Sequence, residues 1–145
     1  PMAAPVVVVG VDGSERSVQA LVAAARLAAA TGNRIVAIHV VRDHSLAAAA
    51  PVSSAGALAV TDDEVTDRSH MDCELVLASA DVAWQFEVRH GDPATELAQA
   101  AVDHNATCVT IGRTLRRRVV CGSRSTMERL ALRCDRPVLI VPSRT

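Results

Sequence analysis

The sequence contains no lysine, because all 15 of its basic residues are arginine. A Walker A loop needs a lysine directly after its last glycine, so the missing lysine excludes a P-loop nucleotidase. Aromatic residues are nearly absent as well, since the chain has only Trp84 and Phe86. Its 145 residues fit a single domain, spanning 1–145, and 50% of them are hydrophobic. The core must therefore be built from Val, Leu, Ile and Ala.

Cysteine pairs are missing too. Cys73, Cys108, Cys121 and Cys134 form no CxxC motif and no disulfide-framework spacing. His70 and Cys73 are two candidate metal ligands, too few for a zinc site, so no metal is expected. Free thiols fit a reducing cytoplasm. We interpret Cys121, which directly precedes a predicted helix, as a buried or half-buried thiol rather than a reactive one.

Long apolar segments and an excess of one charge are the remaining absences. No run of about 18 apolar residues occurs, so neither a membrane span nor a signal peptide is expected. The net charge is −1, and the arginines of Arg113–Arg118 are not extended by a basic surface elsewhere. We therefore expect neither a membrane nor a nucleic acid as partner.

The chain begins with a complete strand–helix–strand unit. Pro5–Val11 is a continuous β-branched run, which predicts a strand buried on both faces. The Asp12-Gly13-Ser14 turn follows, with Ser14 as helix N-cap. Thr31–Asn33 ends the helix, and Arg34–Val41 forms the second strand. The predicted apolar face of the helix consists of Val18, Leu21, Val22, Ala25 and Ala28.

The middle of the chain is the least regular part. Arg42–Thr61 has few large apolar residues, and we expect residues 44–61 to form a variable, mobile loop. A helix is predicted over Asp62–Ala80, with Met71, Leu75 and Ala78 as its core stripe. The alternating pattern of Val82–Arg89 predicts a strand, with Trp84 and Phe86 in the core rather than stacking on a base.

The last part alternates in the same way. Asp92 and Pro93 begin a helix whose apolar face is Leu97, Ala98, Ala101 and Val102. A strand at Cys108–Ile111 follows. The final helix spans about Ser123–Arg133, with Ser125 and Glu128 at capping-box spacing, and Arg136–Val141 is the last strand.

Strict alternation of strands and helices predicts an α/β fold. We expect a three-layer, Rossmann-like α/β/α domain with a five-stranded, mainly parallel sheet in the order 3-2-1-4-5. Ligands of such sheets bind beyond the carboxyl ends of the strands, at the point where strand order reverses. The turns at Gly10–Ser14, Val40–His44 and Gly112–Ser123 meet there.

One of these turns has the composition of an anion site. Gly112 ends a strand, Arg116-Arg117-Arg118 follow, and Gly122-Ser123 leads into a helix. Glycine allows close backbone approach, and the helix N-terminus favours negative charge, which together predict phosphate binding. The alternative is an ordinary strand–helix turn with its arginines in solvent.

Several stretches in order resemble the universal stress protein family: VVVVGVDGSERSVQAL, IHVV, VRHGDPATELAQAA and GSRSTMERLALRCDRPVLIVP. The resemblance covers nearly the whole chain apart from about residues 44–72. It implies a cytoplasmic regulatory module of the stress response that binds ATP or AMP, with Mg²⁺ accompanying ATP only. It also implies a homodimer formed through the last strand, Val138–Val141.

The family's ATP-binding motif, Gly-x-x-Gly, nine residues and Gly-Ser or Gly-Thr, is incomplete here. Nine residues separate Gly112 from Gly122. Leu115 therefore replaces a glycine if Gly112 is the first of the motif, and Val109 replaces one if it is the second. By resemblance, Asp12 lies at the adenine–ribose region, and the backbone near Val40 and Val41 holds adenine. The residues implied to bind nucleotide are Asp12, Val40, Val41, Gly112, Arg113, Gly122, Ser123, Arg124 and Ser125.

Two other hypotheses remain. The chain could keep the fold and the dimer without a nucleotide and act through protein partners, which the incomplete glycine motif favours. It could instead be an enzyme of the adenine-nucleotide α-hydrolase group, but GVDGSERS is poor in the glycine and serine that those enzymes use after strand 1. No catalytic triad or acid–base pair is evident, so we predict no catalytic residues, slow ATP hydrolysis aside.

Overall fold

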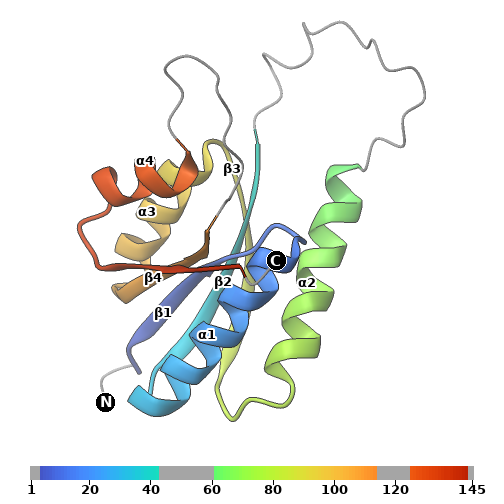
Figure 1. The fold of residues 1–145 in the computed structure, drawn as a ribbon, viewed down its shortest axis with the longest axis vertical. Coiled ribbons are helices and arrows are strands. Elements are labelled where there is room, and N and C mark those ends of the chain that lie inside the picture. The colour runs from blue at the N-terminus through green and yellow to red at the C-terminus, as the bar shows by residue number, and fades with distance from the viewer. Residues whose placement is uncertain (1–3, 43–60, 114–124, 144–145) are drawn as a thin grey trace, which may run out of the picture.

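The computed structural model describes residues 4–42, 61–113 and 125–143. Its described residues form five strands and four helices in strict alternation (Figure 1). The strands are β1 (Val6–Gly10), β2 (Arg34–Val41), β3 (Trp84–His90), β4 (Ala106–Gly112) and β5 (Val138–Val141). The helices are α1 (Glu15–Thr31), α2 (Asp62–Leu77), α3 (Pro93–Asp103) and α4 (Thr126–Arg133). The strands pair in parallel in the order β3-β2-β1-β4-β5, which confirms the predicted topology.

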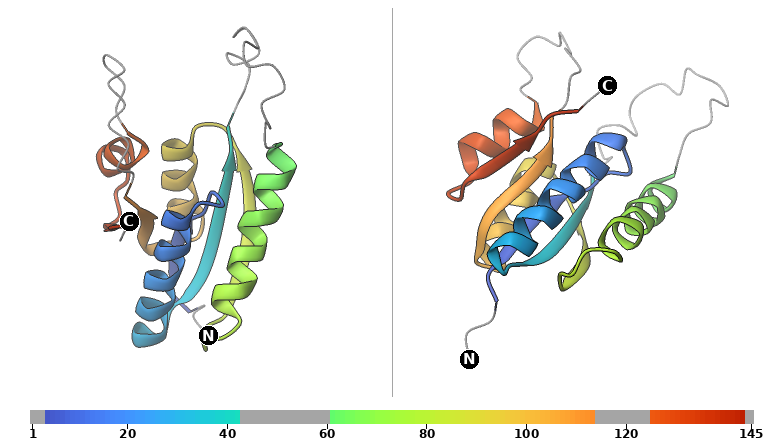
Figure 2. Two further views of the ribbon diagram at one scale, coloured as in Figure 1. Left: turned by 45° about the vertical axis from the view of Figure 1, so that its right-hand side comes forward. Right: turned by 60° about the horizontal axis from the view of Figure 1, so that its bottom comes forward.

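The sheet lies between two layers of helices. Helices α1 and α2 cover one face, and α3 and α4 cover the other (Figures 1 and 2). Strand β1 lies in the middle, with Val7 and Val9 facing the first pair of helices and Val6 and Val8 facing the second. Successive side chains of a strand point to opposite faces, so a valine run fits a strand that is covered on both.

The predicted helix starts are confirmed where the structure describes them. Ser14, Asp92 and Ser125 each accept a hydrogen bond from a backbone N–H in the first turn of the helix that they cap. The sequence analysis missed a fourth cap, a full capping box between Thr61 and Glu64 at the start of α2. Thr61 therefore belongs to the start of this helix, and residues 43–60 lie outside the described part of the chain.

The predicted core stripe of α2 is wrong. Met71 is 59% exposed and Leu75 is 71% exposed, and Ala78 is exposed as well. The buried residues of α2 are Ser69, Cys73 and Leu77, which repeat every four positions on the other side of the helix. Two of the three are small, so the helix axis can lie close to α1 and the sheet.

The predicted apolar faces of α1 and α3 are correct for most of their residues, but one valine in each helix is exposed. Leu21, Ala25 and Ala28 are buried in α1, and Leu97 and Ala101 are buried in α3. In contrast, Val22 and Val102 are exposed, whereas the alanines Ala20, Ala24, Ala94 and Ala100 are buried. Alanine occupies the lines of closest approach because its small side chain lets a helix pack tightly on a sheet.

Candidate ligand site at the carboxyl edge of the sheet

The carboxyl ends of β1, β2 and β4 bring together residues that are far apart in the sequence. Strand β1 pairs with β2 on one side and with β4 on the other, so strand order reverses at β1. The Asp12 turn follows β1, Val40 and Val41 end β2, and Gly112 ends β4. This edge is the upper end of the sheet in Figure 1. It is the position where open α/β sheets bind ligands.

Asp12 shapes the turn after β1 with one carboxylate oxygen, and its second oxygen makes no hydrogen bond to the described residues. Its Oδ1 accepts hydrogen bonds from the backbone N–H of Ser14, at 3.0 Å, and from the Ser14 hydroxyl. Ser14 in turn caps α1 by accepting from the Ser17 N–H. Within the described residues, Oδ2 of Asp12 accepts no hydrogen bond, and the side chain is exposed. Asp12 can therefore shape the turn and contact a ligand at the same time.

The backbone of β2 presents Val40 to this edge. The N–H of Val11 donates to the carbonyl of Ile38 at 2.9 Å, and the N–H of Gly91 donates to the carbonyl of Val41 at 2.9 Å. Ile38 thus faces β1 and Val41 faces β3. Because hydrogen-bonding groups alternate sides along a strand, the N–H and C=O of Val40 face the β1 side, next to the Asp12 turn. The carbonyl of Val41 is used within the sheet.

Gly112 is required for packing at the end of β4. A Cβ added there would lie 2.5 Å from the carbonyl oxygen of Arg16 in the first turn of α1. Any side chain at this position would thus push β4 and α1 apart. The next residue, Arg113, is exposed and donates its N–H to the Val141 carbonyl at 2.7 Å.

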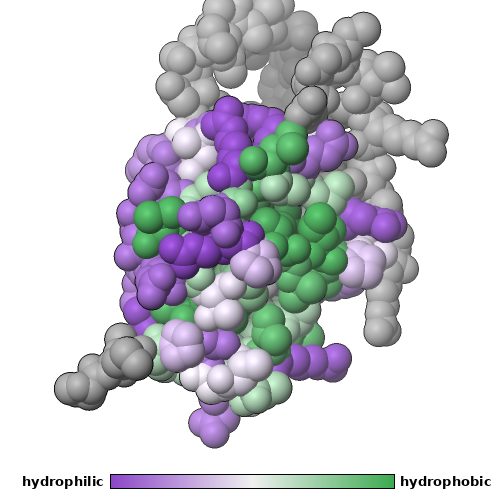
Figure 3. Space-filling model, turned by 90° about the vertical axis from the view of Figure 1, so that its left-hand side faces the viewer, coloured by the Kyte–Doolittle hydropathy of each residue, from purple (hydrophilic) through white to green (hydrophobic). Residues whose placement is uncertain are grey.

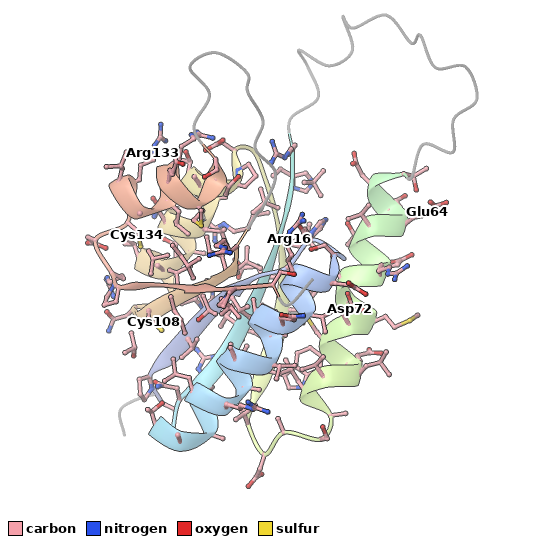
Figure 4. The ribbon with its side chains drawn as sticks, in the orientation of Figure 1. Arg16, Glu64, Asp72, Cys108, Arg133 and Cys134 are labelled. Atoms are coloured by element: carbon pink, nitrogen blue, oxygen red, sulfur yellow. The ribbon has the colours of Figure 1, made fainter. Side chains whose placement is uncertain are left out.

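This contact adds Arg16 to the edge, a residue that the sequence analysis did not select. Arg16 belongs to the first turn of α1, and Figure 4 shows it at the end of the helix that lies nearest the carboxyl edge. Its only sequence signal was its place two residues after the Ser14 cap. Arg16 and Arg113 are thus two described cations at this edge.

Helix α2 closes one side of the Asp12 turn. A Cβ on Gly13, which has a φ of 80°, would lie 3.4 Å from the Arg68 side chain and 3.7 Å from Ser69 Oγ. Ser69 Oγ and Asp72 Oδ2 are buried and have no hydrogen-bond partner among the described residues. Burial raises the pKa of Asp72; the Arg68 charge opposes this shift and the Asp12 charge adds to it. The Asp12 charge therefore contributes to the environment of Asp72.

Of the residues from 122 to 125 that are predicted to contact phosphate, the structure describes only Ser125. Ser125 is the N-cap of α4 and accepts from the Glu128 N–H at 3.2 Å. The predicted contacts Gly122, Ser123 and Arg124, together with Cys121 and Arg116–Arg118, lie outside the described residues. They stay predictions.

The other clusters of titratable groups are structural. Arg89 on β3 binds Glu87 at 2.8 Å, Glu96 at 3.1 Å and Asp103 at 3.0 Å, and His104 lies 3.0 Å from Glu87. Burial opposes a charge on Arg89, but the hydrogen bonds that it donates to these carboxylates raise its pKa. The network connects β3 with α3, and each of its charged groups is paired with another member of the network.

The described residues offer neither a metal cluster nor a membrane-spanning helix. Across residues 4–42, 61–113 and 125–143, no cluster of three or more His, Cys, Asp or Glu side chains is suited to a metal ion. Within the same ranges, no helix has the length and apolar character needed to cross a membrane.

Comparisons with known proteins agree on one family. The sequence profile of the Universal stress protein family matches residues 5–142. No curated protein matches the chain.

Solved structures show the same fold at low sequence identity. A universal stress protein family member from Burkholderia pseudomallei is 24% identical, with a TM-score of 0.67 over 99% of this chain and 100% of that one. The Archaeoglobus fulgidus universal stress protein in complex with dAMP is 16% identical, with a TM-score of 0.68 over 97% and 99%. A universal stress protein in complex with cAMP is 21% identical, with a TM-score of 0.65 over 97% and 98%.

Proposed function

The chain belongs to the universal stress protein family, and from that premise we propose that it binds an adenine nucleotide and acts as a regulatory module of the stress response. One observation carries the proposal. Asp12 Oδ2 and the backbone of Val40 converge at the edge where strand order reverses. Structural neighbours were solved with dAMP and with cAMP, both adenine nucleotides.

The described residues suggest how the nucleoside would be held. The Val40 N–H and C=O suit the hydrogen-bonding edge of adenine, and Asp12 Oδ2 suits a ribose hydroxyl, since a carboxylate accepts strongly from such a donor. Arg16 and Arg113 would place positive charge near the phosphates. Gly122, Ser123, Arg124 and Ser125 remain the proposed phosphate contacts, at the N-terminus of α4.

We propose ATP or AMP as the ligand, with Mg²⁺ bound only together with ATP. We also propose that the protein is not an enzyme, slow hydrolysis of ATP aside. One histidine close to this edge supports that proposal: His39 is buried, and its Nδ1 lies 2.9 Å from the Val11 carbonyl. A side chain held in this way is not free to act as a general base.

We further propose a homodimer formed through β5, in the cytoplasm. Strand β5 is an edge strand, and its Leu139 and Ile140 are 41% and 36% exposed. Figure 3 shows hydrophobic surface on the side of the molecule where α4 and β5 lie. An uncovered apolar edge strand favours pairing with a second chain. The buried, unpaired thiols of Cys73 and Cys108 support a reducing compartment.

A second candidate keeps the fold and the dimer without a nucleotide. The packing of Gly112 favours it, because the contact with Arg16 requires this glycine whether or not a phosphate binds. The glycine is then no evidence for a ligand, and the family motif is left with Gly122-Ser123 alone. In this candidate the protein would act through protein partners only.

The test begins with the purified protein, which is denatured and examined for adenine nucleotide by chromatography and mass spectrometry. Nucleotide-free protein is then titrated with ATP and AMP by calorimetry. Asp12→Asn keeps an oxygen for Ser14 but removes the charge, and we expect it to weaken binding about tenfold or more. Asp135→Asn is the matched control, because Asp135 precedes β5 and thus lies at the amino ends of the strands, away from the candidate site. No co-purified nucleotide and no heat with millimolar ligand would favour the second candidate.

A further inference from the structure

The outward face of α2 combines exposed apolar side chains with a row of acidic ones. We propose that this face, defined by Glu64, Asp67, Met71, Glu74 and Leu75, is a docking surface for a basic, amphipathic segment of a partner protein. The inference rests on the regulatory role proposed above only in that a regulator needs a partner. It does not depend on a bound nucleotide.

The apolar part of the surface lies away from the core. Met71 and Leu75 are one helical turn apart, at 59% and 71% exposure, and both point away from the buried stripe of Ser69, Cys73 and Leu77. Single exposed apolar residues are common and need no explanation. Two long ones stacked at i and i+4 form a continuous strip, and covering it would remove apolar area from water.

The charges around this strip are nearly all of one sign. Glu64, Asp67 and Glu74 are exposed and lie within about 60° of Met71 around the helix axis, and the exposed Arg68 lies at about the same angle on the side opposite Glu74. In Figure 4, Glu64 lies on the outer side of α2, whereas Asp72 lies on the side toward α1. Arg68 is the one basic residue of the helix besides His70. The Arg68 stem approaches Gly13, and its charge acts on Asp72, so it leans toward the Asp12 turn.

The negative charge of this α2 face indicates which kind of partner can bind it. Nucleic acids and anionic membranes would be repelled by an acidic face. A second copy docking through the same face would place one acidic row against another, because a two-fold interface brings equal surfaces together. A polypeptide with apolar residues at helical spacing and flanking Arg or Lys would cover Met71 and Leu75 and pair with the carboxylates.

The surface continues toward β3 through an aromatic contact. The His70 ring stacks on Phe86 with 4.8 Å between centroids and meets Trp84 edge-on at 6.3 Å. His70 also lies 3.6 Å from Glu74, a member of the acidic row. Trp84 is the only tryptophan of the chain. Its fluorescence therefore reports on this side of the molecule when the added peptide contains no tryptophan.

The experiment uses the full chain and a synthetic, tryptophan-free peptide of about 18 residues, designed as an amphipathic helix with a leucine face flanked by arginines. A scrambled peptide of equal composition and a version with glutamate in place of arginine are the peptide controls. Binding is measured by anisotropy of labelled peptide and by Trp84 emission. We expect the patterned peptide to bind at least about tenfold more tightly than the scrambled one.

Variants of exposed residues locate the binding. Met71→Ser with Leu75→Ser should weaken binding at least about tenfold, because both apolar contacts are lost. The triple variant Glu64→Gln, Asp67→Gln, Glu74→Gln should remove most of the salt dependence. Leu132→Ser on α4 is the matched control, since Leu132 is 68% exposed on the other face of the sheet and should leave binding unchanged. Circular dichroism and thermal melting verify that each variant is folded.

Three results would overturn the proposal: equal binding of patterned and scrambled peptides, unchanged binding by the Met71–Leu75 variant, or self-association that this variant abolishes. Nucleotide content is measured on the same samples. If no nucleotide is found but the peptide binds at α2, only the proposed nucleotide function fails. If nucleotide binds and the peptide does not, only the docking surface fails.

Discussion

Helices α2 and α3 lie on opposite faces of one sheet and bury different kinds of side chain. Helix α3 buries Leu97 with three alanines, and it contacts β1, β2, β4 and α4. Helix α2 buries Ser69, Cys73 and Leu77 and contacts α1, β2 and β3. The first is packed over the centre of the sheet, whereas the second lies toward its β3 edge.

The polar groups of the two helices also differ, because those of α3 are paired and two of those of α2 are not, within the described part of the chain. Asp92, the N-cap of α3, binds the guanidinium of Arg129 through both oxygens, at 2.6 and 2.7 Å. On α2, the buried oxygens of Ser69 and Asp72 have no partner among the described residues. The polar groups of α3 are thus paired with α4, whereas α2 has buried oxygens without a described partner and exposes apolar and acidic side chains.

The largest expected effect is at the centre of α3. Leu97 is 4% exposed and would meet a side chain at Gly10 at 3.2 Å. Leu97→Ala should lower the free energy of unfolding by about 2–5 kcal/mol, because it leaves a cavity in the core. Leu75→Ala on α2 is the control and should change it by less than about 0.5 kcal/mol. Urea unfolding measures both, and equal costs would contradict the difference between the helices.

The caps of the two helices should differ by a smaller amount. Asp92→Ala removes the α3 cap and the Arg129 pair, and we expect a loss of about 1–2 kcal/mol in unfolding free energy. Thr61→Ala removes the α2 cap, which has no such partner across helices in the described structure, and should cost about 0.5–1 kcal/mol. Thermal melting of both variants in one buffer compares them. A larger cost for Thr61→Ala would reverse the ranking.

Acid should weaken the α3–α4 contact. Burial acts to raise the pKa of Asp92, but the hydrogen bonds from Arg129 and Thr95 outweigh it and lower this pKa to about 2. A depressed carboxyl pKa stabilises the fold above the unfolded value of 3.8, and this contribution is lost as pH falls toward about 2. Arg129→Gln should flatten this part of the stability–pH curve. An unchanged slope would show that the pair contributes nothing.

The smallest effect should have the opposite sign, on α2. Burial raises the pKa of Asp72 above 3.8, so its ionised form is disfavoured in the folded state. Stability from Asp72 is then present below pH 3.8 and lost as pH rises through the higher folded pKa. Asp72→Asn should therefore raise the melting temperature at neutral pH and leave it unchanged at low pH. Asp67→Asn, which removes an exposed carboxylate of the same helix, is the control; a lower melting temperature for Asp72→Asn at neutral pH would refute the argument.

The fold could be predicted because its signals are local and repeated. The valine run of β1, the Ser14 and Asp92 caps and the alternation of strands with helices each depend on neighbours in sequence. The placement of three candidate residues at one edge could also be predicted: Asp12 follows β1, and Val40 and Gly112 lie at the ends of β2 and β4, which must meet in a parallel sheet. Arg16, Ser69 and Asp72 were missed because their positions depend on how α1 and α2 pack at that edge.

The α2 stripe shows the limit of periodicity. Helical periodicity placed Met71, Leu75 and Ala78 inside, but the space between α1 and the sheet is filled by Ser69 and Cys73, which are small, and by Leu77. Hydrophobicity alone does not tell which side of a weakly amphipathic helix faces the core.

By itself, the sequence determined the order of elements, the parallel sheet and the edge where a ligand would bind. These follow from hydrogen-bonding and burial patterns that each segment carries locally. Tertiary structure alone decided that Gly112 is needed against the Arg16 backbone, that Asp72 has a buried oxygen without a partner among the described residues, and that α2 turns Met71 and Leu75 to solvent. Such features depend on steric fit and charge between segments distant in the chain, which no local pattern encodes.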